Sequence, residues 1–253
     1  IGEKRLMLSY ASKFTPEQFK QFDQAFRPKN KAFIKADLTG KDRTRWHYQR
    51  YIKNYLRCVK AVDENIGRML DYLDRKKLTK NTIVIYSSDQ GFWLGEHGWF
   101  DKRWMYEESL HTPLLIRWPN SIKPSSKNEL LVSNLDFAPT FLELAGAKPA
   151  KDMQGESLLP LFKGNNPKDW RKTHYYHYYE AGGHGVPIHY GVTDGKQKLI
   201  RFPDNTLNTW EFFDLHKDPM EMKNLYAEKS YRTNIQLMKK ELHRLRKLYK
   251  IED

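Results

Sequence analysis

Apolar and polar positions follow the period of an α-helix from Asp42 to Leu73. Aromatic and aliphatic side chains recur there at steps of three and four, and Arg and Lys occupy the opposite side. Positions at this spacing share one helix face, so the segment predicts a long amphipathic helix packed on a sheet, with Gly67 allowing a close contact. The apolar positions are Tyr48, Tyr51, Ile52, Tyr55, Val59, Val62, Ile66, Met69 and Leu73.

A shorter helix is predicted before it. Thr15 followed by Pro16 is typical of a helix start, because Thr caps the free backbone N–H groups and Pro is favoured at the first helical position. Phe19, Phe22 and Phe26 then share one face of a short helix. Residues 5–11 fit a short strand.

A run of β-branched residues at 82–86 predicts a strand buried on both faces, as in the centre of an α/β sheet. Ser87, Ser88, Asp89, Gln90 and Gly91 follow it. Polar groups just past the carboxyl end of a central strand lie where α/β folds place their sites, and Gly91 permits a sharp turn. A second strand is predicted at 114–118. The loop between the two strands is rich in Gly, His, Asp, Lys and Arg, which makes it the best candidate for binding an anion.

A helix is predicted at 134–145, after a loop rich in Pro and Ser. Pro139 is tolerated only in the first turn of a helix, so the true start is expected near Asp136. Gly146 provides a stop. Gly155-Glu-Ser-Leu-Leu lacks the second Gly of a Gly-x-Ser-x-Gly nucleophile turn, which excludes a serine-hydrolase elbow there.

The last third of the chain predicts a small antiparallel sheet and a terminal helix. Aromatic and β-branched runs at 173–179, 190–193, 198–202 and 211–215 are separated by turn sequences. A basic helix is expected at 226–249. Its candidate apolar contacts are Ile235, Leu237, Leu242, Leu245 and Leu248.

Composition adds a strong positive charge to this picture. The chain has 253 residues and a formal net charge of +13. Such a charge favours polyanionic partners (sulfated glycans, nucleic acid or anionic surfaces), although a solvated basic surface fits the charge equally well. No apolar run is long enough to span a bilayer. The single Cys58 excludes an internal disulfide and is expected to be a buried apolar residue in the long helix.

Several separate motifs resemble the second half of type I sulfatases, which belong to the alkaline-phosphatase superfamily. They are Ser-Asp-Gln-Gly at 88–91, Gly-Glu-His-Gly-Trp at 95–99, Asp-Lys-Arg-x-Met-Tyr-Glu-Glu-Ser at 101–109 and Phe-Asp-Leu-His-Lys-Asp-Pro at 213–219. The chain is most similar to the N-acetylglucosamine-6-sulfatase-like group. The resemblance implies an α/β fold, in which residues 1–165 form the C-terminal part of an alkaline-phosphatase-like sheet with flanking helices. Residues 166–253 are then a C-terminal α+β subdomain.

The resemblance also assigns roles in a charged site. Asp89 and Gln90 carry hard oxygen donors suited to Ca²⁺ or Mg²⁺, and the family implies that they are Ca²⁺ ligands. Lys102 matches the lysine that contacts the sulfate and offsets charge on the leaving oxygen. Asp101 and Arg103 are expected to orient Lys102 or to touch the sugar.

Three histidines are further candidates for substrate binding. His184 and His189 lie in a segment similar to the subdomain loop that reaches the sugar in glycan sulfatases, where a neutral imidazole can bond to a hydroxyl. His97 lies in a Gly-rich loop, where substrate contact and structural packing are equally open.

The function implied by the resemblance is hydrolysis of sulfate esters on glycans, with 6-O-sulfated N-acetylglucosamine as the expected substrate and no nucleic acid partner. Phosphodiesterases and phosphonate hydrolases of the same superfamily are the enzymatic alternative. A non-catalytic domain that binds sulfated glycans is the alternative from another class. The family implies a periplasmic, secreted or lysosomal location.

One required part of a sulfatase is absent from the sequence. The family forms its formylglycine nucleophile in a Cys/Ser-x-Pro-x-Arg motif, and no Cys or Ser here has Pro two residues later. The acidic pair that completes the calcium site is also missing before residue 80. The chain is therefore expected to be the C-terminal half of a sulfatase domain. Its missing N-terminal half then comes from another chain or a longer precursor, or the chain as given lacks hydrolase activity.

Overall fold

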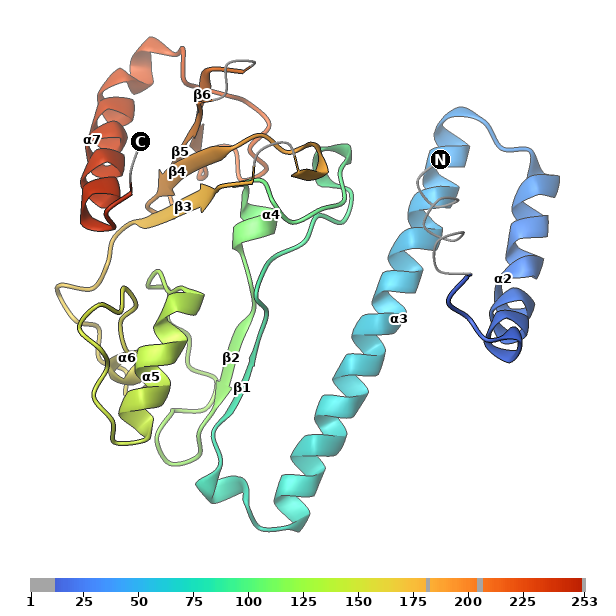
Figure 1. Ribbon diagram of the computed structural model, residues 1–253, viewed down its shortest axis with the longest axis horizontal. Coiled ribbons are helices and arrows are strands. Elements are labelled where there is room, and N and C mark those ends of the chain that lie inside the picture. The colour runs from blue at the N-terminus through green and yellow to red at the C-terminus, as the bar shows by residue number, and fades with distance from the viewer. Residues whose placement is uncertain (1–11, 181–182, 204–206, 252–253) are drawn as a thin grey trace. The chain divides into compact units, whose positions relative to one another are not determined.

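The computed structural model describes residues 12–180, 183–203 and 207–251 (Figure 1). The strand predicted at 5–11 lies outside these residues. Contacts divide the chain into two compact units, residues 1–65 and 66–253. The predicted domain boundary after residue 165 stays a prediction. None of the helices in the described part of the chain combines the length and the apolar character needed to cross a bilayer.

The first unit contains α2 (Pro16–Ala36) and the beginning of α3 (Gly40–Arg75). The predicted helix start is confirmed, because the Thr15 hydroxyl accepts from the Gln18 N–H at 3.2 Å and the Gln18 side chain accepts from the Thr15 N–H at 3.0 Å. This reciprocal capping satisfies backbone donors at the helix end. The helix is longer than expected. α2 and α3 contact each other through Phe33 and Trp46, whose rings stack 4.1 Å apart.

The long helix α3 is confirmed, but its expected packing is not. It has no buried residue. A Cβ added at Gly67 would meet nothing within 4 Å, and Cys58 is exposed, so the predicted roles of both residues were wrong. The apolar positions have the predicted helical spacing, but none of those described is buried.

The strands around the candidate loop form a two-stranded antiparallel sheet. After the short helix η1 (Thr79–Asn81), β1 (Val84–Ser87) pairs with β2 (Leu114–Arg117), with Ile85 opposite Ile116. The prediction of a strand buried on both faces was wrong for this chain, because Tyr86 is 39% exposed and its neighbours are only half-buried. One face of the antiparallel pair packs through Leu114 and Ile116 against a small apolar core, whereas Tyr86 and Leu115 on the other face are accessible.

The helix predicted at 134–145 is confirmed, together with its expected start and stop. η3 (Asn134–Asp136) leads directly into α5 (Phe137–Leu144), which places Pro139 in the first turn. Gly146 follows with φ of 75° and ends the helix. The short helix α6 (Leu159–Phe162) comes after it.

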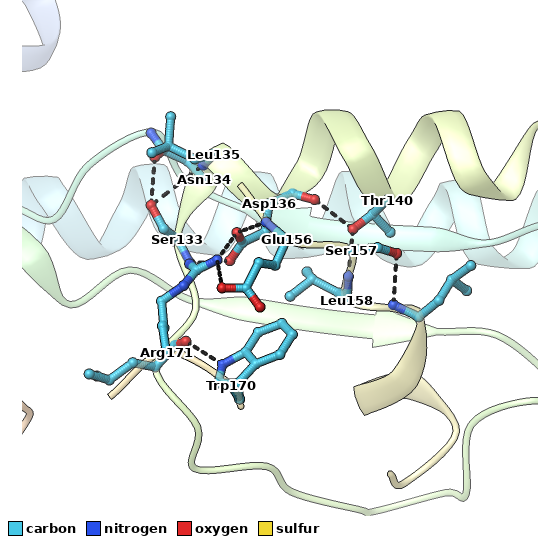
Figure 2. Close-up of polar contacts among 12 residues, drawn as sticks. Ser133, Asn134, Leu135, Asp136, Thr140, Glu156, Ser157, Leu158, Trp170 and Arg171 are labelled. Atoms are coloured by element: carbon cyan, nitrogen blue, oxygen red, sulfur yellow. Dashed lines mark hydrogen bonds and ion pairs between the residues drawn. The ribbon is translucent and has the colours of Figure 1, made fainter. Parts of the chain in front are cut away.

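A buried carboxylate joins three segments of this region (Figure 2). Asp136 is 0% exposed and forms a bidentate pair with Arg171. Its oxygens also accept from the backbone N–H groups of Ser133 at 2.7 Å and Glu156 at 2.8 Å. Four donors therefore compensate the loss of water around the charge, which makes its burial tolerable.

The C-terminal sheet has four antiparallel strands in chain order: β3 (His174–Tyr178), β4 (His189–Thr193), β5 (Gln197–Phe202) and β6 (Thr209–Asp214). The short helix η4 (Gly183–Gly185) lies between β3 and β4, and η5 (Lys229–Tyr231) directly precedes the terminal helix. The terminal helix α7 (Arg232–Leu248) covers one face of the sheet (Figure 1). The sheet and the terminal helix are confirmed, but the helix begins at Arg232 and not at the predicted Tyr226.

The two faces of this sheet contact different parts of the chain. Side chains alternate between faces along a strand. Leu199 and Phe212 pack with α7, whereas Ile200, Phe202 and Phe213 pack with Trp93, Met105 and Tyr106. We call the second face the loop face. On α7, Leu237 and Leu248 are 60% and 57% exposed, so these two predicted contacts were wrong, and Met238 is buried instead.

Candidate functional site

Two loops run side by side in the candidate site. The first loop comprises residues 88–93 and the second loop comprises residues 101–107. The Gly91 N–H donates to the Ser109 carbonyl at 2.9 Å, in α4 (Glu107–Leu110), and the Trp93 N–H donates to the Asp101 carbonyl at 2.8 Å. These bonds bring the predicted metal ligands and the predicted anion-binding loop into one region.

Gly91 is required by this close approach. A Cβ at this position would lie 2.0 Å from the Glu108 carbonyl oxygen. Any other residue would force the first loop away from α4, so Gly91 allows this contact as well as the turn that the sequence suggested.

Asp89 and Gln90 leave their side-chain oxygens available. Asp89 is exposed and Gln90 is half-buried, while the Ser88 hydroxyl fixes the turn by donating to the Gln90 carbonyl at 2.7 Å. Within the described part of the chain, neither side chain has a hydrogen-bond or ion-pair partner. The same residues contain no group of three or more His, Cys, Asp or Glu that could hold a metal. Since Ca²⁺ takes about 6–8 oxygen ligands, these two donors fit part of a calcium site.

Lys102 has the chemistry expected of an anion contact. Asp101 and Arg103 form an ion pair with each other. The half-buried Lys102 forms no hydrogen bond or ion pair within the described residues. Its ammonium is therefore the cation of this triplet that has no internal counter-charge.

The three predicted histidines occupy different environments. His97, in η2 (Glu96–Gly98), donates from Nε2 to the Met220 carbonyl at 2.7 Å and packs edge-on against Trp93 at 5.0 Å. This geometry favours the structural alternative for His97. His184, in η4, is exposed.

His189 is buried and fully bonded. It is 0% exposed, and Nδ1 contacts the Pro187 carbonyl at 2.9 Å while Nε2 accepts from the Met105 N–H at 3.1 Å. Nδ1 therefore carries the proton. Burial lowers the pKa of His189, which favours this neutral form. No ring nitrogen is left for a sugar, so we do not carry His189 forward as a substrate contact.

A buried lysine was missed by the sequence analysis. Lys198 is 0% exposed and contacts Glu107 Oε1 at 2.8 Å and Glu221 Oε1 at 2.7 Å. Neither Nζ nor Glu221 Oε1 has a well-aligned hydrogen bond, so these contacts are ion pairs. Lys198 lies on the same side of a predicted strand as the apolar residues Ile200 and Phe202, because the three are spaced two residues apart. A lysine at such a position was the signal available in the sequence.

Two family models match the chain. Residues 7–147 match the model described as Sulfatase, and residues 95–248 match that of N-sulphoglucosamine sulphohydrolase, C-terminal. An N-acetylglucosamine-6-O-sulfatase of Bacteroides thetaiotaomicron is 46% identical over 236 residues, which are 92% of this chain and 42% of that protein. Human N-acetylglucosamine-6-sulfatase is 31% identical over 62% of this chain and 30% of that protein. The chain thus spans less than half the length of these curated relatives.

Solved structures show the same relationship. A protein in complex with its substrate D-glucosamine-2-N,6-O-disulfate has a TM-score of 0.90 and 44% identity, over 97% of this chain and 50% of that chain. A phosphonate monoester hydrolase of Agrobacterium radiobacter has a TM-score of 0.65 and 25% identity, over 74% of this chain and 39% of that chain. These neighbours support the predicted fold class, an α/β core of the alkaline-phosphatase type with a C-terminal antiparallel subdomain.

Proposed function

The chain belongs to the sulfatase family, and from that membership we propose that it forms part of a sulfuric ester hydrolase acting on sulfated glycans. We propose 6-O-sulfated N-acetylglucosamine as the substrate unit, because the relative with 46% identity carries that specificity in its name. Such an enzyme would work in the periplasm, in a lysosome or outside the cell.

The observation that carries this proposal is the state of Lys102. Its ammonium has no internal counter-charge among the described residues, and its loop is bonded to the loop of Asp89 and Gln90. An ammonium in this position would offset negative charge on the sulfate and on the sugar oxygen as the sulfur–oxygen bond breaks. The Asp101–Arg103 pair beside it would orient Lys102 or bond to sugar hydroxyls. The exposed His184 is a further candidate for sugar contact.

The proposed enzyme also needs groups that this chain does not provide. Asp89 and Gln90 would supply two oxygen ligands of a Ca²⁺ ion, which polarises the sulfate group when bound. The formylglycine motif is absent from the sequence. The nucleophile and the remaining calcium ligands would therefore come from the N-terminal half of a sulfatase domain.

The test uses an enzyme in which the remaining half of the domain completes this chain. Lys102→Ala is expected to lower kcat for sulfate release from N-acetylglucosamine 6-sulfate by about 100-fold or more, without changing Tm. Lys127→Ala, in an exposed loop, is the control. Unchanged turnover in Lys102→Ala would remove the role of Lys102.

The same assay separates the alternatives. Faster turnover of a phosphate or phosphonate ester than of the sulfate ester would favour the phosphonate hydrolase function. Retention on heparin without sulfate release, even with added calcium, would favour a binding domain.

A further inference from the structure

Every strand of the C-terminal sheet sends one polar side chain from the loop face to the second loop. The sheet order and register place these positions on one side, together with Ile200 and Phe202. The four residues are Tyr176 of β3, His189 of β4, Lys198 of β5 and Glu211 of β6.

Two of these residues bond to the backbone that follows Lys102, at residues 103 and 105. The Tyr176 hydroxyl donates to the Arg103 carbonyl at 2.6 Å, and His189 Nε2 accepts from the Met105 N–H at 3.1 Å. On the other side of Lys102, the Asp101 carbonyl accepts from Trp93. The peptide group before Lys102 and the peptide group after Arg103 are thus held by residues outside the second loop.

The other two residues hold the end of the second loop through buried charges. Lys198 contacts the carboxylates of Glu107 and Glu221, and the Glu107 N–H donates to Glu221 Oε2 at 2.7 Å. The Tyr106 hydroxyl donates to Glu211 Oε2 at 2.7 Å. An ammonium with no exposed surface is costly unless it is paired, so Lys198 strongly restrains the position of Glu107.

Gly191 lets the sheet come close to the second loop. A Cβ at this position in β4 would lie 2.6 Å from Met105 Sδ and 2.3 Å from the Leu199 carbonyl oxygen. Met105 is 0% exposed against this strand. The loop face therefore fits the second loop by shape as well as by hydrogen bonds.

We propose that Tyr176, His189 and Lys198 are positioning residues for Lys102, which fix the second loop from the sheet side. The catalytic value of holding Lys102 in place rests on the proposed function of Lys102 as the contact of the sulfate. A catalytic group held in place needs no reordering when substrate binds, and a misplacement of about 1 Å can cost about 100-fold in rate. The C-terminal sheet then serves the reaction without touching the substrate.

The first test measures amide hydrogen exchange on the 253-residue chain and does not depend on catalysis. His189→Phe keeps a ring in the aromatic packing but removes the acceptor for the Met105 N–H. His189→Gln keeps an acceptor oxygen. Exchange at Met105 should rise by about tenfold or more in His189→Phe and stay near wild type in His189→Gln, while the amides of β5 and β6 remain protected.

A second variant covers the case in which His189→Phe does not fold. Tyr176→Phe removes only the hydroxyl that bonds to the Arg103 carbonyl, and it should raise exchange in the second loop with the sheet intact. Unchanged exchange at Met105 in a folded His189→Phe chain, or throughout the second loop in Tyr176→Phe, would overturn the proposal.

The second test uses the completed enzyme. A positioning residue acts through Lys102, so Tyr176→Phe should lower kcat by about tenfold when Lys102 is present and hardly at all in a Lys102→Ala background. Equal losses in both backgrounds would overturn the positioning role. If the completed enzyme hydrolyses no sulfate ester, the proposed function fails, and the exchange experiment still decides whether the sheet fixes the loop.

Discussion

Asp136 shows how a single buried charge organises its surroundings. Arg171 and two backbone N–H groups occupy its oxygens, and the Asp136 carbonyl accepts from Thr140, whose hydroxyl oxygen accepts from the Leu158 N–H at 2.8 Å. Figure 2 shows these contacts as one connected group. Such a group is stable only when each member finds its partner.

We expect Asp136→Asn to destabilise the chain by about 3–5 kcal/mol, because it leaves the Arg171 charge only the more exposed Glu156 at 3.6 Å and turns an amide NH₂ toward backbone donors. Urea denaturation measures this loss. Asp152→Asn, at an exposed position, is the control and should change stability by less than about 0.5 kcal/mol. A loss near the control value would show that the pair contributes little.

Gly91 and Gly67 give opposite expectations for the same substitution. Gly91→Ala places a methyl group 2.0 Å from the Glu108 carbonyl oxygen, which forces the first loop away from α4 and should cost about 1–3 kcal/mol or more. Gly67→Ala meets open space in α3 and should stabilise the helix by about 0.5–1 kcal/mol. Thermal unfolding of both variants checks the pair; an equal effect at the two positions would contradict the close approach at Gly91.

The first two strands of the C-terminal sheet, β3 and β4, carry histidines that resist protonation. Burial, the Arg246 charge and His189 lower the pKa of His177 from its ordinary value near 6.5 to about 4. Burial also lowers the pKa of His189, and burial and the Arg171 charge lower that of His174. The unfolded chain binds these protons more readily than the folded chain.

The sheet should therefore be fully stabilised by these groups above about pH 6.5 and should lose that stability as pH falls toward 4. Burial raises the pKa of Glu211 and Glu221, which acts in the opposite direction, so the informative quantity is a difference between variants. His177→Gln should reduce the slope of stability against pH by up to about 1.4 kcal/mol per pH unit, and the exposed His216→Gln should not. Identical slopes in denaturation series would refute this role of His177.

Elements with local signals were predictable from the sequence. The Thr15 cap, the position of Pro139 and the Gly146 stop each depend on a few neighbouring residues, and all three are observed. Burial was less predictable because it depends on distant partners. Helix α7 begins at Arg232 and buries Ile235, Met238, Leu242 and Leu245, which leaves Leu237 and Leu248 outside that stripe.

The candidate site was predictable only in part. Motifs placed Asp89 and Lys102 in two loops, and the structure joins those loops by backbone bonds. The contacts of Met105 with His189 and of Tyr106 with Glu211 span 84 and 105 residues, so no local pattern reports them. The position of Lys198 on the apolar side of a predicted strand indicated an unusual lysine. Its partners Glu107 and Glu221 could not be predicted, because they are determined by the tertiary structure.

Large apolar side chains are exposed at many positions in the described part of the chain. Leu56, Val59 and Val62 on α3 are 53%, 46% and 47% exposed, and Leu115 of β2 is 64% exposed. Contiguous exposed apolar surface promotes association between molecules. The chain also spans less than half the length of its curated relatives. The apolar stripe of α3 therefore gives this chain, studied alone, a surface for self-association.

We expect the isolated chain to self-associate through this stripe, and Val59→Glu to reduce the association because it places a charge within it. Ala61→Glu adds the same charge at an exposed position about 200° around the helix, since successive residues are rotated by about 100°. Sedimentation velocity over a range of concentrations measures the effect. Val59→Glu should sediment as a smaller species than wild type, whereas Ala61→Glu should resemble wild type. Equal association of all three forms would assign the contact to another surface.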